Sequence, residues 1–166
     1  MDIKKPTRKT IMQFLMVILA VFVIRVWQQQ DLITGIAPSF TSKTLSGEIV
    51  NSKPLPNQAV LIHFWATWCG ICRLENDNIQ AISQDYRVLN IAMQSGTDTE
   101  LKEYAKAHNM RLDNMINDNS GTLAKLFGVR ATPSSFFINP KGRIQFSEVG
   151  YVTTFGYRLR LWWATL

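Results

Sequence analysis

Residues 64–75 of the chain read Phe-Trp-Ala-Thr-Trp-Cys-Gly-Ile-Cys-Arg-Leu-Glu. The apolar and aromatic run that leads into them, Ala59–Trp65, is typical of a short strand buried on both faces. After the cysteines, apolar residues recur at spacings that place them near one, inward face of a helix; they are Leu74, Ile79, Ile82 and Tyr86. The stretch therefore predicts a strand that passes into a helix, with a Cys-X-X-Cys pair at the junction.

The spacing of the two cysteines indicates reactivity rather than cross-linking. Cys69 and Cys72 are the only cysteines in the 166 residues. A disulfide across three positions restrains little of the unfolded chain, and two thiols cannot complete a four-ligand zinc site. A thiol at a helix N-terminus faces unpaired N–H groups, which favour the thiolate. We therefore expect Cys69 to be the exposed nucleophile and Cys72 the buried resolving thiol.

Two other interpretations of the pair remain open at this point, namely inert core thiols and metal ligands. Haem attachment requires histidine directly after the second cysteine, and Arg73 stands there. A copper(I) carrier would use clustered methionine and cysteine ligands. Met93, Met110 and Met115 are scattered, so we predict no resident metal and no cofactor.

The rest of the chain predicts an α/β fold. Residues 40–44 and 48–51 form a hairpin pattern around Leu45-Ser-Gly47, and buried-type strands are expected at 88–93, 134–138 and 144–149. Helices are expected at 98–108, around 122–127 and at 154–164, with a loop rich in Asn and Asp between the first two. This order implies a mixed central sheet with helices on both faces.

The helical spacings also predict which side chains point inward. In the helix over 98–108 these are Leu101, Tyr104 and Ala105, with Thr97 or Asp98 as the cap. In the last helix Phe155, Leu159 and Trp162 share one face. Arginines beside tryptophans at 157–163 are also found at membrane interfaces, but we expect this helix to cap the sheet.

The first thirty residues predict a membrane anchor. Four basic residues precede an apolar stretch over 11–27, which as a helix spans about 25 Å. The positive-inside rule then gives a cytoplasmic basic tail at 1–10, a transmembrane signal anchor at 11–27, a linker at 28–35 and an exported domain at 36–166. A cleaved signal peptide is the alternative, although Arg25 and the residues after it lack the small side chains of a cleavage site.

The charge distribution argues against nucleic-acid binding. The net charge is +6, of which residues 1–30 contribute +4 and residues 31–166 only +2. A basic excess confined to a terminal block offers no surface along which a phosphate backbone could bind.

Four motifs together resemble the thioredoxin-like family, in particular its membrane-tethered extracytoplasmic branch, which is also called TlpA/DsbE-like. They are the stretch 64–75, the opening motif 37–40, Gly128-Val-Arg-Ala-Thr-Pro133 and the hairpin 137–143. Within that branch the residues after Cys72 and the closing Arg-Leu-Arg-Leu-Trp are most similar to the suppressor-of-copper-sensitivity protein D type. The resemblance implies a thioredoxin-like domain over residues 36–166.

The resemblance also implies roles for individual residues. Pro133 would be a cis-proline facing the disulfide, and Thr132 would offer its backbone to an extended substrate. Trp68, Gly70 and Ile71 would line the substrate site. His63 occupies the place of a buried acid in thioredoxin, and Glu75 that of a glutamate in tethered reductases. Both are candidates for proton transfer, against the alternatives of a core histidine and a solvated carboxylate.

The predicted function is therefore thiol–disulfide oxidoreduction on exported proteins. The protein would act in the periplasm of a bacterium, held by a single span in the inner membrane, as a reductase recharged by a membrane electron donor of the DsbD/ScsB kind. The copper-sensitivity resemblance implies a role in copper tolerance. The alternatives are a periplasmic thiol oxidase that uses the same cysteines and a non-catalytic copper-binding protein.

Overall fold

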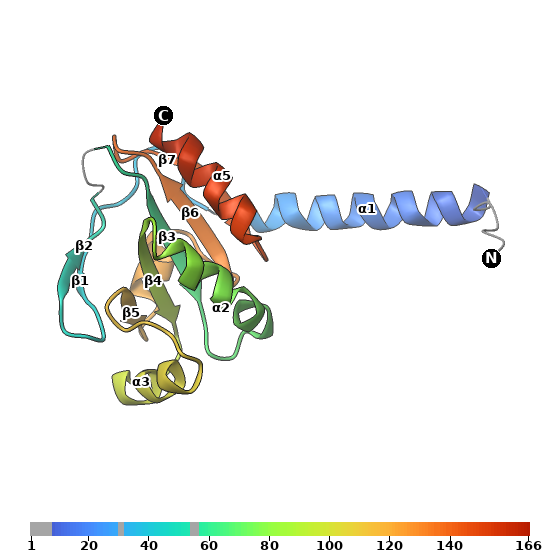
Figure 1. Cartoon of the computed structure of the whole chain (residues 1–166). Coiled ribbons are helices and arrows are strands. Elements are labelled where there is room, and N and C mark those ends of the chain that lie inside the picture. Colours follow the sequence, from blue (N-terminus) through green and yellow to red (C-terminus); the bar gives the residue numbers. More distant parts are fainter. Residues whose placement is uncertain (1–7, 30–31, 54–56) are drawn as a thin grey trace. The chain divides into compact units, whose positions relative to one another are not determined.

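A computed structural model describes residues 8–29, 32–53 and 57–166, and it divides into two units, residues 1–30 and 31–166 (Figure 1). The predicted basic tail lies mostly outside the described residues, and so do residues 30 and 31 of the predicted linker. The second unit carries the whole sheet and both cysteines.

In the first unit the structure describes the helix α1 (Arg8–Gln29). Helix formation over the predicted anchor is confirmed, but the predicted span is not: in the part of the chain that the structure describes, no helix is long and apolar enough to cross a membrane.

A five-stranded mixed sheet forms the centre of the second unit. Its strand order is β5-β4-β3-β6-β7. The strands are β3 (Val60–Trp65), β4 (Arg87–Met93), β5 (Met115–Asp118), β6 (Ser134–Ile138) and β7 (Ile144–Val149). The first three run parallel, and β6 is antiparallel to both β3 and β7. A separate hairpin of β1 (Thr41–Lys43) and β2 (Ile49–Asn51) precedes them, as predicted.

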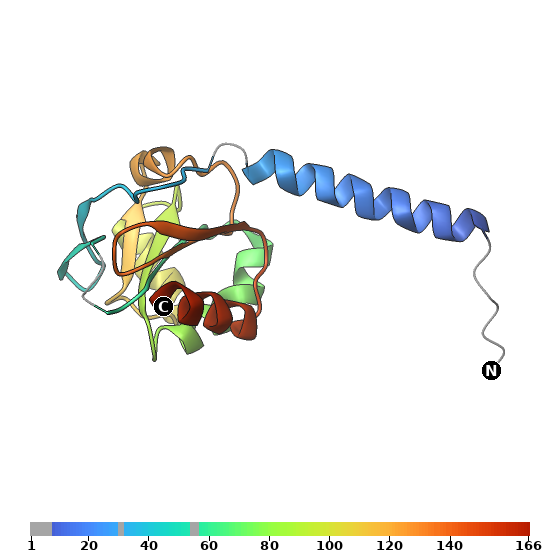
Figure 2. The ribbon, with the colours of Figure 1, turned by 90° about the horizontal axis from the view of Figure 1, so that it is seen from above.

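Both faces of the sheet are covered by helices, which confirms the predicted α/β architecture. Side chains alternate along β3, so Val60, Ile62 and Phe64 pack on one face with Phe127, which caps the short helix α4 (Thr122–Leu126). The opposite face carries α2 (Gly70–Ile82) and α5 (Thr154–Thr165), which lie beside each other (Figures 1 and 2). A third helix, α3 (Asp98–Ala107), packs Leu101 and Ala105 against the sheet.

The predicted inward faces of two helices need correction. Phe155 of α5 is 74% exposed, and Leu159 and Trp162 are exposed too, whereas Tyr157, Leu161 and Ala164 are buried. Apolar residues occur around most of α5, so their spacing does not indicate which face is buried. The buried face is the one that carries Tyr157, whose hydroxyl group has buried polar partners. On α2, Ile79 and Ile82 are buried as predicted, but Leu74 is 74% exposed.

Strand β5 was missed by the sequence prediction, which placed a loop there. Its residues, Met115-Ile-Asn-Asp118, alternate poorly and include two residue types that are rare in strands. Pairing with β4 in parallel register stabilises the extended conformation nonetheless, and Met115 and Ile116 are fully buried.

The start of α3 provides a quantitative test of local capping. Thr97 accepts a hydrogen bond from the backbone of Glu100, whose side chain accepts one from the backbone of Thr97, which forms a capping box. We expect Thr97→Ala to lower the free energy of unfolding by about 1 kcal/mol, because the backbone N–H of Glu100 loses its acceptor and the Glu100 carboxylate loses the Thr97 hydroxyl. Urea unfolding measures this, with the exposed Thr99→Ala as the control; equal effects of the two substitutions would contradict the capping assignment.

Candidate active site

The two cysteines form a disulfide at the N-terminus of α2. Cys69 is the N-cap residue and Gly70 begins the helix, so the bond bridges the cap and the first turn with the Cα atoms 5.3 Å apart. The backbone N–H of Cys72 donates to the Sγ atom of Cys69 at 3.1 Å. A backbone donor and the positive end of the helix dipole therefore both face this sulfur, an arrangement that stabilises a thiolate.

The sequence predicted an exposed Cys69 and a buried Cys72, but burial does not distinguish the two residues. Cys69 is 7% exposed and Cys72 is 5% exposed, so neither residue is open to solvent in the disulfide form. What distinguishes them is position. Cys69 lies at the rim, beside exposed side chains, and Cys72 lies one turn inside the helix.

Two exposed apolar side chains lie next to the cysteines in the chain. Trp68 is 60% exposed and Ile71 is 51% exposed. The indole N–H of Trp68 donates to the backbone oxygen of Gln94 at 3.2 Å, which fixes the ring beside the end of β4. These two predicted substrate-site residues therefore lie together at the surface next to the disulfide.

The loop before β6 borders the disulfide from the other side. The Thr132–Pro133 peptide bond is cis, as the resemblance implies. The backbone oxygen of Thr132 lies 3.6 Å from the Sγ atom of Cys69. The fold thus brings Cys69, Thr132 and Pro133 together across 63 positions of sequence.

Glu75 is fully buried, so the alternative of a solvated helix-face carboxylate is wrong. Its Oε1 atom accepts the backbone N–H of Val152 at 2.6 Å and the hydroxyl of Tyr157 at 3.0 Å. Among the described residues its Oε2 atom has no hydrogen-bond partner. Burial is the larger effect and raises the pKa of Glu75 from 4.5 to about 7, although both hydrogen bonds oppose it.

His63 lies on β3 beside this carboxyl group. Its Nδ1 atom is 2.9 Å from the hydroxyl of Ser135, which in turn is 2.9 Å from that of Tyr157. Burial lowers the pKa of His63 to about 3, so the imidazole is neutral at physiological pH. Its Nε2 atom is 3.8 Å from Oε2 of Glu75, too far for a hydrogen bond. Because burial favours the neutral form of both groups, the two do not form an ion pair.

Sequence reasoning missed Tyr157 and Ser135, which link His63 to Glu75. Tyr157 was overlooked because its helix was assigned the wrong inward face. A usable signal was present, since Tyr157, Leu161 and Ala164 form an apolar stripe of their own with a single hydroxyl. Ser135 pairs with His63 across neighbouring strands, a relation that only the register of β3 and β6 reveals.

A metal site is not found among the described residues. Nowhere in ranges 8–29, 32–53 and 57–166 do three or more His, Cys, Asp or Glu side chains gather in a way that could hold an ion.

Comparison with known proteins agrees with this geometry. The model of the AhpC/TSA family matches residues 33–147, more than half of the chain. A thioredoxin-like protein of Haemophilus influenzae is 27% identical over 126 residues, which are 75% of this chain and 74% of the relative.

Two further similarities concern thiol chemistry. The thiol:disulfide interchange protein DsbE of Pseudomonas fluorescens is 32% identical over 118 residues, 69% of this chain and 65% of that protein. A crystal structure from Chlorobium tepidum, described as a thiol:disulfide interchange protein DsbE, superposes with a TM-score of 0.70 at 22% identity. That superposition covers 81% of this chain and 99% of the other, and it establishes the thioredoxin-like fold.

Proposed function

The chain belongs to the AhpC/TSA family of thioredoxin-like proteins and is a protein disulfide oxidoreductase, and on that premise we propose that it reduces disulfides in exported proteins through Cys69 and Cys72. The observation that carries the proposal is the placement of the Cys69–Cys72 bond. It sits on a helix N-terminus, between an exposed apolar rim and a buried carboxyl group whose pKa lies near neutrality.

The proposed reaction proceeds in two displacements. The Cys69 thiolate attacks one sulfur of a substrate disulfide, which forms a mixed disulfide and releases the first substrate thiolate. Cys72 then loses its proton and attacks the Sγ atom of Cys69, which forms the Cys69–Cys72 bond and releases the second thiolate. Both released thiolates take up protons. The substrate gains two electrons, and an external dithiol must return the pair to the reduced state.

Glu75 is the better candidate for receiving the proton of Cys72. It lies three residues further along α2, on the same side of the helix. With a pKa of about 7 it is partly ionised at neutral pH, so it can take up a proton and release it. His63, with a pKa near 3, is a poor proton acceptor at pH 7. We assign His63 the role of orienting Ser135 and Tyr157.

The rim residues Trp68 and Ile71 are proposed to contact the substrate. A polypeptide crossing the disulfide would place apolar side chains against them and its backbone beside Thr132, as an added strand does. Their exposure of 60% and 51% leaves this surface available.

We also propose that the protein works outside the cytosol, tethered to the inner membrane through residues 11–27. The support is the sequence alone, with four basic residues before an apolar stretch. Membrane fractionation followed by protease treatment of spheroplasts tests it. Full-length protein in the membrane fraction that is digested from outside supports the proposal, and recovery in the soluble cytosolic fraction contradicts it.

The similarity to the suppressor-of-copper-sensitivity D type supports a narrower proposal, that the clients are exported proteins whose thiols copper oxidises. Cells lacking this protein should then grow more poorly in copper than the parent strain. Complementation by the wild type but not by Cys69→Ser would tie the effect to disulfide reduction, and complementation by Cys69→Ser would contradict it.

The direction of electron flow is tested by the resting redox state of the pair in cells, trapped with acid and read by thiol alkylation. The reductase proposal expects a reduced pair that becomes oxidised when the membrane electron donor, of the DsbD/ScsB kind, is deleted. A pair that is oxidised in both strains would contradict the reductase proposal and favour an oxidase that uses the same residues.

A further inference from the structure

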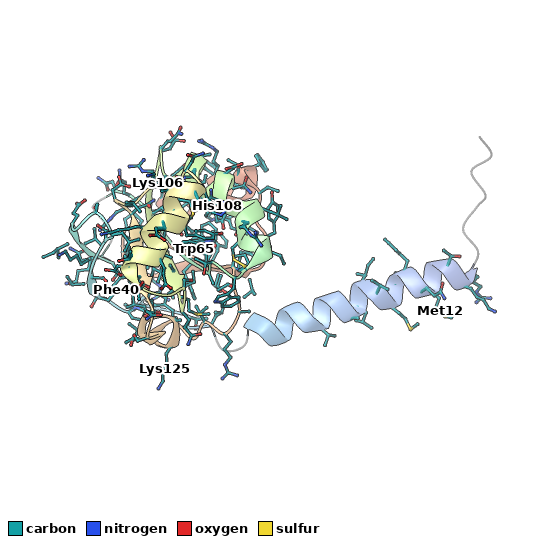
Figure 3. All side chains as sticks on the ribbon, turned by 90° about the horizontal axis from the view of Figure 1, so that it is seen from below. Met12, Phe40, Trp65, Lys106, His108 and Lys125 are labelled. Carbon is teal, nitrogen blue, oxygen red and sulfur yellow. A yellow bond between two sulfur atoms is a disulfide. The ribbon has the colours of Figure 1, made fainter. Side chains whose placement is uncertain are left out.

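A network of buried hydrogen bonds connects strands β3 and β6 and helix α5 to Glu75. His63 and Ser135 are direct partners in the register of β3 and β6, so their side chains lie beside each other on one face of the sheet. Trp65, two residues after His63, points to the same face and is labelled in Figure 3. Tyr157 reaches this face from α5. The four linked residues, His63, Ser135, Tyr157 and Glu75, are 0–2% exposed, and we call them the Glu75 network.

The direction of each hydrogen bond in the Glu75 network follows from the protons that are present. The hydroxyl of Tyr157 donates to Oε1 of Glu75 at 3.0 Å, and burial raises the pKa of Tyr157 well above its ordinary value of 10, so the hydroxyl keeps its proton. The Tyr157 oxygen lies 2.9 Å from the hydroxyl of Ser135, which must therefore donate to it. The Ser135 oxygen then accepts from Nδ1 of His63 at 2.9 Å. Every donor of the network thus points toward Glu75.

The network makes the two carboxyl oxygens of Glu75 unequal. Oε1 accepts hydrogen bonds from the backbone N–H of Val152 and from Tyr157, whereas Oε2 has no hydrogen-bond partner among the described residues. A proton that Glu75 takes up therefore binds Oε2. Donors that point at a carboxylate favour its charged form, so both hydrogen bonds lower the pKa of Glu75 against the larger, opposite effect of burial.

We propose that Tyr157 is a positioning residue for disulfide exchange: its hydroxyl, oriented by Ser135, holds Oε1 of Glu75 so that the carboxylate can take up the Cys72 proton on Oε2 near neutral pH. The inference rests on the proposed role of Glu75 as the acceptor of that proton. The S–H electron pair stays on Cys72, whose thiolate then attacks the Sγ atom of Cys69 and expels the substrate thiolate. Glu75 afterwards releases its proton to solvent, from which the expelled thiolate takes one up.

The titratable and charged groups that face Glu75 or Tyr157 come from four elements. They are Cys72 on α2, His63 on β3, Tyr157 on α5 and Glu148 on β7, which is paired with Arg160 at 2.7 Å. Burial lowers the pKa of His63 to about 3, so the imidazole carries no charge at pH 7 and acts on Glu75 only through its hydrogen bond to Ser135. Arg160 offsets the charge of Glu148. Tyr157, in contrast, donates directly to the carboxyl group, and its removal should change the protonation of Glu75 most.

A jump in pH isolates resolution by Cys72 and tests the proposal. Reduced protein is loaded at pH 4 with one equivalent of an aromatic disulfide that reacts in acid, which leaves an aromatic thiol on Cys69. After a jump to a pH between 5.5 and 9.5, Cys72 expels that thiol, and its absorbance gives the rate. We expect Tyr157→Phe to move the half-maximal rate about one pH unit higher, because a carboxylate that loses a hydrogen bond has a higher pKa. The rate at pH 7 should fall about fivefold, and the two proteins should converge at pH 9.5.

Two further variants control this experiment. Tyr151→Phe removes the hydroxyl that accepts from Asn78 at the surface, outside the Glu75 network, and should leave the pH profile of resolution unchanged. Ser135→Ala removes the donor to Tyr157 and should move the profile in the same direction as Tyr157→Phe, by about half a pH unit. If Tyr157→Phe does not fold, the profile of Ser135→Ala decides the test.

The Glu75→Gln profile distinguishes failure of this inference from failure of the proposed function. If Glu75→Gln abolishes the dependence of resolution on pH near 7 while Tyr157→Phe keeps the midpoint of the wild type, the role of Tyr157 is overturned and that of Glu75 stands. A rate that Tyr157→Phe lowers equally at every pH would show a purely structural role and would overturn the proposal as well. A Glu75→Gln profile equal to that of the wild type would instead contradict the proposed role of Glu75.

Discussion

Replacement of Cys69 by serine should lower disulfide reductase activity by a factor on the order of 10³ or more, because no other thiol at the rim can form the mixed disulfide. Cys69 alone combines the N-cap position, the backbone donor from Cys72 and contact with the loop that contains Pro133. The measurement is the initial rate of reduction of a small disulfide-bonded protein with a chemical dithiol as the electron source.

Cys72→Ser is the matched variant and has a different expected outcome. Its Cys69 still attacks, but nothing resolves the mixed disulfide, so a covalent complex with the substrate should accumulate and migrate more slowly on a non-reducing gel. The double variant Cys69→Ser/Cys72→Ser should capture nothing. A stable complex formed by Cys69→Ser but not by Cys72→Ser would reverse the two assigned roles.

Glu75→Gln should remove a pH-dependent loss of stability that the wild type shows. The pKa of Glu75 is about 7 in the folded protein and 4.5 in its ordinary environment, so the folded state holds the proton more tightly. The stability that the folded protein gains by holding this proton is fully present below pH 4.5 and is lost as the pH rises through 7. The difference of 2.5 pH units corresponds to about 3 kcal/mol. Glutamine keeps the acceptor for Val152 and Tyr157 without a charge to bury.

Urea unfolding at pH 4, 6 and 8, with the disulfide intact, measures this effect. The wild type should lose about 3 kcal/mol relative to Glu75→Gln between pH 4 and pH 8, with most of the change between pH 5 and 7. Glu103→Gln, on the exposed side of α3, is the control and should follow the wild type. Parallel stability curves for the wild type and Glu75→Gln would contradict the raised pKa.

The same substitution should also slow resolution by Cys72 by about 10²-fold at pH 7, because the carboxylate that accepts its proton is lost. Reduced protein is mixed in a stopped-flow instrument with an aromatic disulfide whose thiolate absorbs visible light. Attack by Cys69 releases the first coloured thiolate and resolution by Cys72 releases the second, so the second phase measures the effect and the first serves as the internal control. An equal rate in Glu75→Gln would contradict the proposed role of Glu75 as the acceptor of the Cys72 proton.

Much of the fold could be predicted because local signals and tertiary packing agree over most of the domain. The apolar run before Cys69 forms β3, and the turn signal at 139–142 joins β6 and β7. Strand β5 could not be predicted in this way. Its Asn and Asp residues disfavour an extended conformation, and pairing with β4 overrides that preference.

The candidate site shows where sequence patterns fail and why. On α2 the helical spacing predicts Leu74 inside and leaves Glu75 as an ambiguous carboxyl group, and the structure buries Glu75 and exposes Leu74. A buried carboxyl group next to an exposed leucine contradicts the rule that apolar side chains of a helix face the core and charged ones face solvent. Such departures are expected at functional sites. The partners of Glu75 come from Val152 and Tyr157, about 80 positions away, so no local pattern contains them.

The central claim is that Cys69 and Cys72 exchange two electrons with a protein disulfide, and electron stoichiometry tests it most directly. Fully reduced protein is mixed with one equivalent of a protein that holds a single disulfide, quenched with acid and alkylated, and both proteins are weighed by mass spectrometry. We expect one Cys69–Cys72 disulfide to form for each substrate disulfide lost. A substrate that stays oxidised beside a reduced pair, or is reduced while the pair remains reduced, would contradict the account.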